Sequence, residues 1–290
     1  MIIKDIIIKD ILTSKKLPQF VLFVLLVFIF PACQKVINID LNEAAPHIVI
    51  EGLITDGDGP YTVKISKSGS YFNQPELPPV SGAQVIISDD EGTVDTLKEI
   101  TAGIYMTSLM RGIPGRTYTL KVSAENKDYT GSSTMHSHVA IDSLRLIKDD
   151  SQRFGFRTDT REEMHKEIHC YFKDPEEKNF YRIKVITNDS TEASHYRLYD
   201  DQYTNGQETD LRVAHPKSGD ITTILLYSLD GGTFEYYRTL EDIIDSNPIF
   251  GSTPANPNTN LSNGALGYFG AGAVSSKTIV ITDSLLNSVK

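Results

Sequence analysis

The sequence predicts a mainly β protein, in which an antiparallel sandwich is followed by a second antiparallel β domain with one main helix. Two observations support this fold class. Short apolar runs with a period of two recur from His47 onward, roughly every 8–12 residues, and turn-forming residues separate them. One later stretch changes to the spacing of an amphipathic helix. The 290 residues leave room for a leader and either one large or two ordinary domains.

The first predicted domain covers residues 47–137. Its β-rich runs are HIVIEGLIT, YTVKISKS, AQVIISDD, GTVDTLKE, IYMTSLM, TYTLKVSAE and YTGSST. Because successive side chains of a strand point to opposite faces, alternate residues of two of these runs should enter a core. The expected core residues are Tyr61, Val63, Ile65, Tyr118, Leu120 and Val122, whereas Thr62, Lys64 and Ser66 should face water.

The second predicted domain covers residues 138–290. Its β-rich runs are IDSLRLI, KEIHCYF, FYRIKVIT, SHYRLYD, TDLRVA, DITTILLYSLD, ALGYFGA and KTIVIT. Among them, Thr233–Asp245 carries its apolar residues at helical spacing, which predicts one amphipathic helix packed on this domain. Thr233 should cap the helix, and Asn247-Pro248 should end it.

An apolar segment near the N-terminus resembles an export signal. Eleven apolar residues from Phe20 to Phe30 follow two lysines and end shortly before Cys33. The run is shorter than the roughly 20 residues of a membrane-spanning helix, and its basic flank is typical of a secretory signal. Cys33 after a small residue looks like a bacterial lipobox, whose cysteine is acylated. We therefore expect a lipoprotein signal peptide at 1–32, a lipidated Cys33 and a tether at 33–46; the alternative is an uncleaved anchor.

The charge of the chain argues against one class of partner. Its 28 basic and 38 acidic side chains give a net charge of -10, and the leader removes four Lys but only two Asp. A nucleic-acid-binding domain needs a basic surface, so we expect no nucleic-acid partner. An acidic chain is not attracted to an anionic membrane, so membrane attachment should depend on a multiply acylated Cys33.

The first half resembles the carboxypeptidase regulatory-like and related immunoglobulin-like β-sandwiches. The resemblance rests on Glu51–Ile54, Pro79–Val85, Gly103–Tyr105 and Gly115–Leu120. Such domains are spacers or packing modules, so the resemblance implies no catalytic residues in this half.

The second half, together with the sandwich, resembles a lipoprotein family of Bacteroidota described as domain of unknown function 4249. The motifs that carry the resemblance are Asp174-Pro175, Asn179–Ile183, Asp201–Tyr203, Asn205–Gln207, Tyr236-Tyr237, Asn247–Phe250, Asn258–Leu261 and Asn263–Gly270. The resemblance covers roughly Cys33 to Ile281. It implies an outer-membrane lipoprotein, often encoded beside TonB-dependent receptors, and implies no known reaction.

No complete catalytic or metal-binding motif is present in the sequence. The chain lacks a Gly-rich phosphate loop after a strand and a Gly-x-Ser-x-Gly elbow. In His165–His169 the Glu follows one residue too late for a zinc protease, and on a strand His165, Glu167 and His169 would share a solvated face. Cys170, without a partner if Cys33 is acylated, should be a buried apolar residue. We therefore predict no enzyme activity, no cofactor and no metal.

Three functions remain open on the sequence alone. The leading prediction is a non-enzymatic outer-membrane lipoprotein that binds or assembles with a TonB-dependent transport system, on either face of that membrane. The neighbourhood of such a transporter is implied by the family resemblance only. The alternatives are an envelope hydrolase acting on glycan or peptide, and a cell-envelope adhesin or structural protein.

We expect the binding surface in the second domain, around Asp201–Gln207 and Ser246–Phe269. Both are polar loops with a few apolar residues, and long loops in compact domains are usually functional or disordered. The apolar residues should hold the second loop on the sheet and leave its Asn side chains free for a partner. The expected binding residues are Tyr203, Asn205, Gln207, Asn256, Asn258, Asn260 and Tyr268. The alternative is a packed crossover that only closes the sandwich.

Overall fold

The computed structural model describes residues 46–69, 77–148, 166–190, 196–245 and 256–289. Contacts divide the chain into Met1–Ala44 and Ala45–Lys290, and the described residues all belong to the second unit. The expected leader, Cys33 and the tether up to residue 45 therefore lie outside the described residues. In the described ranges, no helix is both long and apolar enough to cross a membrane.

The unit Ala45–Lys290 is mainly β, as the alternating runs predict. In chain order its strands are β1 (Ile48–Thr55), β2 (Thr62–Lys67), β3 (Gln84–Asp89), β4 (Val94–Thr96), β5 (Lys98–Thr101), β6 (Ile104–Met106), β7 (Thr117–Ala124), β8 (Lys127–Thr134), β9 (Ile141–Lys148), β10 (Lys166–Lys173), β11 (Phe180–Thr187), β12 (Tyr196–Asp200), β13 (Glu208–Ala214), β14 (Ile221–Leu229) and β15 (Leu266–Val280). The helices are α3 (Gly231–Ile244) and α4 (Asp283–Ser288).

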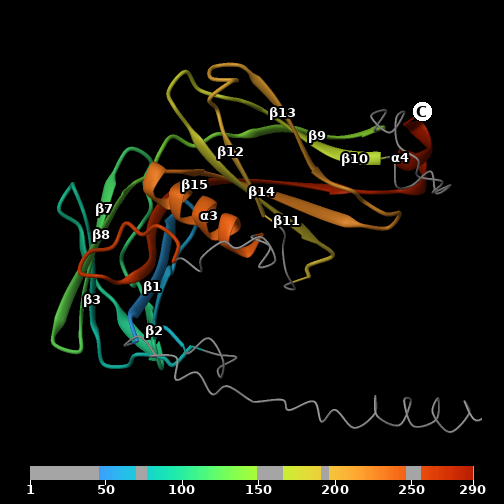
Figure 1. Ribbon diagram of the computed structural model, residues 1–290. Coiled ribbons are helices and arrows are strands. Elements are labelled where there is room, and N and C mark those ends of the chain that lie inside the picture. Colours follow the sequence, from blue (N-terminus) through green and yellow to red (C-terminus); the bar gives the residue numbers. More distant parts are fainter. Residues whose placement is uncertain (1–45, 70–76, 149–165, 191–195, 246–255, 290) are drawn as a thin grey trace, which may run out of the picture. The chain divides into compact units, whose positions relative to one another are not determined.

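Hydrogen bonds arrange the described strands in sheets of eight, four and three strands (Figure 1). The eight-stranded sheet has the order β12-β11-β14-β15-β1-β2-β6-β5, the four-stranded sheet β4-β3-β7-β8, and the three-stranded sheet β13-β10-β9. The expected antiparallel pairing holds except between β1 and β15, which run parallel. The first and last strands of the unit are therefore neighbours.

β15 contributes to both halves of the unit. It is one strand of 15 residues, where the sequence predicted two shorter strands. Near its start, Phe269 and Ala271 are buried in a first core, and Ile279 near its end packs against a second core. These residues share one face because side chains alternate along a strand. The eight-stranded sheet thus forms one layer of two consecutive sandwiches.

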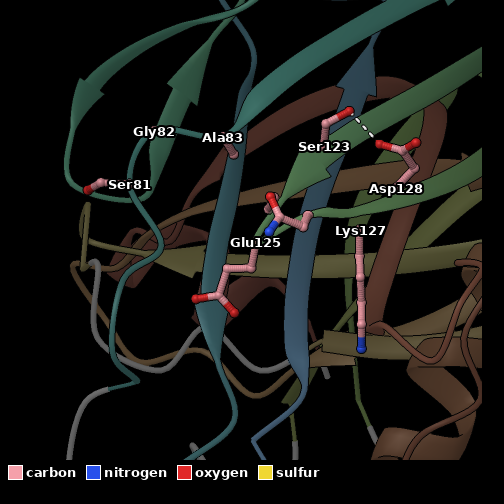
Figure 2. A pocket seen from close by; sticks show the side chains of 9 residues that line it. Ser81, Gly82, Ala83, Ser123, Glu125, Lys127 and Asp128 are labelled. Atoms are coloured by element: carbon pink, nitrogen blue, oxygen red, sulfur yellow. Dashed lines mark hydrogen bonds between the residues drawn. The ribbon is translucent and has the colours of Figure 1, made fainter.

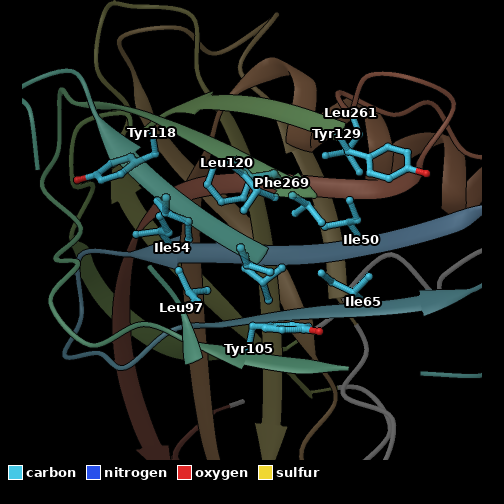
Figure 3. Close-up of a cluster of buried hydrophobic side chains, with 14 of the residues drawn as sticks. Ile50, Ile54, Ile65, Leu97, Tyr105, Tyr118, Leu120, Tyr129, Leu261 and Phe269 are labelled. Carbon is cyan, nitrogen blue, oxygen red and sulfur yellow. The ribbon is translucent and has the colours of Figure 1, made fainter. Parts of the chain in front are cut away.

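The first core lies between the four-stranded sheet and the β1 half of the eight-stranded sheet, and forms the predicted immunoglobulin-like sandwich (Figure 3). The predicted core residues Tyr61, Val63, Ile65, Tyr118, Leu120 and Val122 are all buried here. The prediction for Ser66 was wrong, because only 1% of its surface is exposed. Pro79 pairs with Ser66 through an isolated β-bridge, so a segment outside the predicted strands lies beside this position.

The second core lies between the three-stranded sheet and the β14 half of the eight-stranded sheet. Ile168, Cys170 and Phe172 point into it from β10, and Ile183 and Ile224 from the facing sheet. Cys170 is completely buried, which confirms the expectation of an apolar role. Burial raises the pKa of its thiol to about 12, so it stays protonated.

The expected boundary between residues 47–137 and 138–290 falls where one core gives way to the other along the chain. Met135 belongs to the first core, and Val139 belongs to the second. The eight-stranded sheet nevertheless continues across this point, and Leu261 and Phe269 return to the first core. Independent folding of either segment stays a prediction.

α3 is the expected main helix, and it packs on β15, β11 and β12 (Figure 1). It begins after Asp230, whose side chain accepts a hydrogen bond from the Thr233 N–H at 2.9 Å. Asp230 is therefore the N-cap, and the prediction that Thr233 caps the helix was wrong by three residues. Thr233 packs against Gly270 of β15, where a Cβ atom would lie 2.8 Å from its Oγ1. The missing side chain at Gly270 lets α3 approach the sheet.

Candidate functional site

The loop Asp201–Gln207, called the 201–207 loop below, is braced at both ends by buried carboxylates. At its start, Asp201 is 1% exposed and accepts a hydrogen bond from the Asn179 N–H at 2.7 Å. The Asp201 carbonyl also accepts from the Thr204 N–H at 2.9 Å, which closes a tight turn. These contacts fix the loop to the start of β11.

Asp174 braces the other end of the 201–207 loop. It is 1% exposed, and its carboxylate accepts hydrogen bonds from the Gly206 N–H at 3.0 Å and from the Tyr181 hydroxyl. The Asp174 N–H donates to the Gln207 carbonyl at 3.0 Å. Burial raises the pKa of Tyr181 most, and the hydrogen bond with Asp174 raises it further, so the hydroxyl remains a donor. Hydrogen bonds of this kind offset the free-energy cost of burying a carboxylate.

The braced loop presents its remaining side chains to solvent. Tyr203 is 85% exposed, and Asn205 and Gln207 are exposed beside it. A large, stiff, amphipathic side chain on a fixed backbone suits contact with a macromolecule, because little conformational entropy is lost on binding. The structure thus brings three of the expected binding residues together on one rigid loop.

The expectation that the Asn side chains of residues 256–265 are free was wrong for Asn258 and Asn260. The Asn258 amide donates to Glu235 of α3 at 2.9 Å, and its N–H donates to the Thr239 hydroxyl. Asn260 donates to the Phe269 carbonyl at 2.6 Å and accepts from the Phe269 N–H at 3.0 Å. Both side chains are engaged within the chain, whereas Asn256 is exposed.

The same segment ties the eight-stranded sheet to β8 of the four-stranded sheet. Asn260 also donates to the Ser132 carbonyl at 3.2 Å, and the Asn263 amide donates to the Asp128 carbonyl at 2.6 Å. The Ser262 hydroxyl accepts from the Thr130 N–H at 2.8 Å. These contacts match the alternative interpretation of this segment, a packed crossover that closes the sandwich; residues 246–255 lie outside the described part.

Tyr268, the last expected binding residue, belongs to a cluster of tyrosines beneath α3. Its hydroxyl accepts a hydrogen bond from the Tyr237 hydroxyl at 2.5 Å, and its ring lies 4.7 Å from that of Tyr236. Tyr196 of β12 meets the edge of Tyr237 at 5.5 Å. Burial raises the pKa of Tyr237 and of Tyr268, so both stay protonated. Among the described residues, no hydrogen bond or ring contact links this cluster to the 201–207 loop.

One cation lies within the tyrosine cluster, at a position that no pattern in the sequence marks as functional. The Arg182 guanidinium carbon is 4.5 Å from the ring centre of Tyr227 and 4.4 Å from that of Tyr237. Arg182 lies between buried Tyr181 and Ile183 on β11, so alternation predicts that it points away from the core. Its pairing with Tyr227 depends on strand register, which the sequence does not reveal.

The strand face with Glu167 and His169 differs from the solvated face that was expected, and His165, the third residue of that expectation, lies outside the described residues. The Glu167 side chain is only 3% exposed, and its Oε1 lies 3.1 Å from Arg212 and 3.5 Å from Nε2 of His215. His169 contacts Asp210 through Nδ1 at 2.6 Å. The cause is the register of β13, which places a cation beside Glu167. In the described part of the chain, no three side chains are arranged to hold a metal ion.

An open polar hollow of about 280 Å³ lies beside the β7–β8 hairpin (Figure 2). Ser81 and Gly82 form one side, and Glu125, Lys127 and Asp128 form the other. The Ser123 hydroxyl donates to Asp128 at 2.6 Å. The hollow contains no expected binding residue.

Comparisons with solved structures give weak similarities. The BSP domain of a biofilm-associated protein is 12% identical, with a TM-score of 0.24; the match covers 82% of this chain and only 30% of that chain. The chicken interferon gamma receptor alpha chain is 11% identical, with a TM-score of 0.19, and the match covers 64% of this chain and 90% of that one. The adhesin InvE of Yersinia pseudotuberculosis is 17% identical, with a TM-score of 0.21. The match covers 62% of this chain and 55% of that one.

A search of curated proteins found no match. A family model, in contrast, matches residues 34–278, which is most of the chain. That range includes the 201–207 loop, the tyrosine cluster and β15 up to Thr278. The chain therefore belongs to the family described as Domain of unknown function (DUF4249).

Proposed function

We propose that this protein is a non-enzymatic lipoprotein of the outer membrane that binds or assembles with a TonB-dependent transport system. The observation that carries the binding role is the 201–207 loop, which two buried aspartates hold rigid while Tyr203 is 85% exposed. A preorganised aromatic side chain is typical of an interface anchor.

The membrane part of the proposal rests on the sequence. The basic and apolar leader that ends at Cys33 supports acylation, and the acidic chain needs such an anchor to stay at a membrane. The transporter part is supported by the family resemblance of the motifs, two of which form the 201–207 loop. We propose that the exposed surface of the 201–207 loop is the functional element of the protein, rather than a reaction centre.

Co-purification from detergent-solubilised membranes tests the proposal. The full chain carrying Tyr203→Ala is compared with the unaltered chain and with Leu109→Ala, which removes another exposed side chain (70% exposed) from the first sandwich. We expect a large outer-membrane β-barrel to accompany the unaltered chain and Leu109→Ala, and to be reduced at least about tenfold with Tyr203→Ala at equal thermal stability. Equal recovery of the barrel with all three chains, or no barrel with any of them, contradicts the proposal.

The anchor has its own test. Cys33→Ala should move the protein out of the membrane fraction and abolish incorporation of labelled fatty acid. If both forms stay in the membrane without label, the lipoprotein proposal is wrong, and an uncleaved anchor replaces it. Protease treatment of whole cells then decides which face of the membrane the protein occupies.

A further inference from the structure

Arg182 lacks an acidic partner in the described part of the chain. Two other arginines there differ from this: Arg116 lies 2.6 Å from Asp89, and Arg238 lies 2.7 Å from Glu235. The contacts of Arg182 are instead the rings of Tyr227 and Tyr237. In a chain with a net charge of -10, a partly buried cation without a counter-charge is unusual.

The guanidinium also has unused hydrogen-bonding capacity. Its Nε is buried and has no hydrogen-bond partner among the described residues. A buried donor without an acceptor costs free energy, so such a group calls for an explanation. The two tyrosine rings can offset part of the cost through cation–π attraction, but a ring face does not replace an in-plane acceptor for the fork of an arginine.

The surroundings of Arg182 are suited to a ligand with a polar end. Tyr196, Tyr227 and Tyr268 are each only partly buried and supply ring surface beside the cation. Tyrosine combines an apolar body with a hydroxyl that can donate or accept. The hydrogen bond from Tyr237 to Tyr268 and the packing under α3 fix the arrangement before a ligand arrives.

Acidic side chains near the tyrosine cluster disfavour a ligand with more than one negative charge. The charges of Glu241 on α3 and of Asp245, which follows α3, raise the pKa of Tyr196 in addition to burial, and the charge of Glu51 on β1 does the same for Tyr268. These acids repel an anionic ligand, and they repel a dianion more strongly than a monoanion. A carboxylate has one charge and the planar geometry that matches an arginine fork, whereas a phosphate dianion would be repelled.

We propose that Arg182 and the partly exposed tyrosines Tyr196, Tyr227 and Tyr268 form a binding site for a carboxylate-bearing ligand. The carboxylate accepts hydrogen bonds from the two terminal nitrogens of the guanidinium, which are not among the buried unpaired atoms, and the body of the ligand packs on the tyrosine rings. An acidic sugar and the C-terminus of a peptide share this chemistry. The site lies on strands β11, β12, β14 and β15 and does not depend on the transporter partner proposed above.

Calorimetry on the full chain in detergent tests the site with four probes. Galacturonate and trialanine with a free C-terminus each carry one carboxylate; neutral galactose and trialanine amide carry none. We expect saturable binding of at least one acidic probe and none of its neutral counterpart. Binding of galacturonate alone identifies an acidic sugar as the source, and binding of the free peptide alone identifies a peptide end. The absence of binding by both acidic probes overturns the proposal.

Variants assign the binding to Arg182. Arg182→Lys keeps the charge but loses the bidentate fork, and it should weaken binding at least about tenfold. Arg182→Gln should abolish binding. Arg197→Gln, on the neighbouring strand, removes an arginine that donates to the Arg212 carbonyl, and it should leave the affinity unchanged. Wild-type affinity in Arg182→Lys, or in a folded Arg182→Gln, overturns the proposal; if Arg182→Gln does not fold, the lysine variant decides.

Discussion

Asp56 joins the segment between the two sandwiches to β15 by contacting His138. Its Oδ2 lies 2.7 Å from Nδ1 of His138, and its Oδ1 accepts a hydrogen bond from the Val274 N–H at 2.7 Å. β1 ends at Thr55, so Asp56 follows directly where the parallel pairing with β15 stops. One carboxylate therefore holds three segments that are far apart in the sequence.

Removing this carboxylate should destabilise the unit. We expect Asp56→Ala to lower the free energy of unfolding by about 1–3 kcal/mol, because a charge-assisted contact and a backbone donor both lose their acceptor. Urea unfolding followed by circular dichroism measures the change. Asp58→Ala is the matched control, because the Asp58 side chain is fully exposed and its ion pair with Arg111, at 3.6 Å, is also exposed. Exposed ion pairs contribute little, so this substitution should leave the free energy of unfolding nearly unchanged. Equal effects of the two substitutions contradict the prediction.

Asn260→Ala should separate structure from binding in the 256–265 segment. The substitution removes contacts with the Phe269 backbone and the Ser132 carbonyl, so we expect a loss of about 2–3 kcal/mol of stability. Asn256→Ala, at an exposed position, should change stability by less than about 0.5 kcal/mol. Thermal unfolding of both variants is the measurement. A stable Asn260→Ala variant with lost partner capture would instead support a binding role.

Gly270 should tolerate no side chain. A Cβ atom there would lie 2.8 Å from Oγ1 and 2.9 Å from Cγ2 of Thr233, so Gly270→Val should cost about 1–3 kcal/mol and displace α3. Gly57→Ala serves as the control, since its Cβ would meet only Thr55 Oγ1 at 3.5 Å. Chemical unfolding compares the two, and near-ultraviolet circular dichroism reports the tyrosines beneath α3. A variant at Gly270 with unchanged stability rules out the tight helix contact.

Asp95 should make stability depend on pH in the acid range. Burial raises its pKa, but the N–H groups of Leu109, Met110 and Ser108 hydrogen-bond its carboxylate and lower the pKa below the usual 3.8. The unfolded state then binds the proton more readily, so the stabilisation is present above about pH 4 and is lost as the pH falls through the folded pKa.

The measurement is the free energy of unfolding between pH 7 and pH 2. Asp95→Asn should be less stable than the unaltered protein at pH 7 and should show a shallower decrease toward pH 2, because the titrating group is gone. Asp128→Asn, on the exposed hairpin, should retain the full decrease. An unchanged acid profile in Asp95→Asn would show that this carboxylate does not govern the acid range.

Cys170 should react with thiol reagents only after unfolding. It is completely buried, and burial raises its pKa to about 12, so neither access nor thiolate is available in the folded state. In full-length Cys33→Ala, Cys170 is the remaining cysteine, since the sequence has two. Labelling of this variant with an alkylating reagent should be slow without denaturant and fast in urea. Rapid labelling of the folded protein contradicts the burial.

Local patterns in the sequence predicted the strands and the main helix, because these depend on neighbouring residues. The alternation in YTVKIS correctly placed Tyr61, Val63 and Ile65 in the core. It failed at Ser66, which is buried and pairs through an isolated bridge with Pro79 of another segment. Strand periodicity cannot report what a distant segment places over a strand.

The candidate site was predictable only where the residues are close in the sequence. Tyr203, Asn205 and Gln207 form one loop, and their exposure follows from its polar composition. Asn260 instead bonds Ser132, which is 128 residues away, so its role could not be inferred from composition. Arg182 was missed for the same reason, because its environment arises from the register of β14 and the placement of α3.

The long strand β15 also determines when the protein can finish folding. It pairs with β1, and the register joins Val49 to Leu266. The pairing of β1 can therefore form only after β15 has been synthesised. Neither core is complete until β15 is present, since each takes residues from it. Pairings so distant along the chain form slowly. The two sandwiches therefore stay unfinished until the chain has been made at least as far as the end of β15.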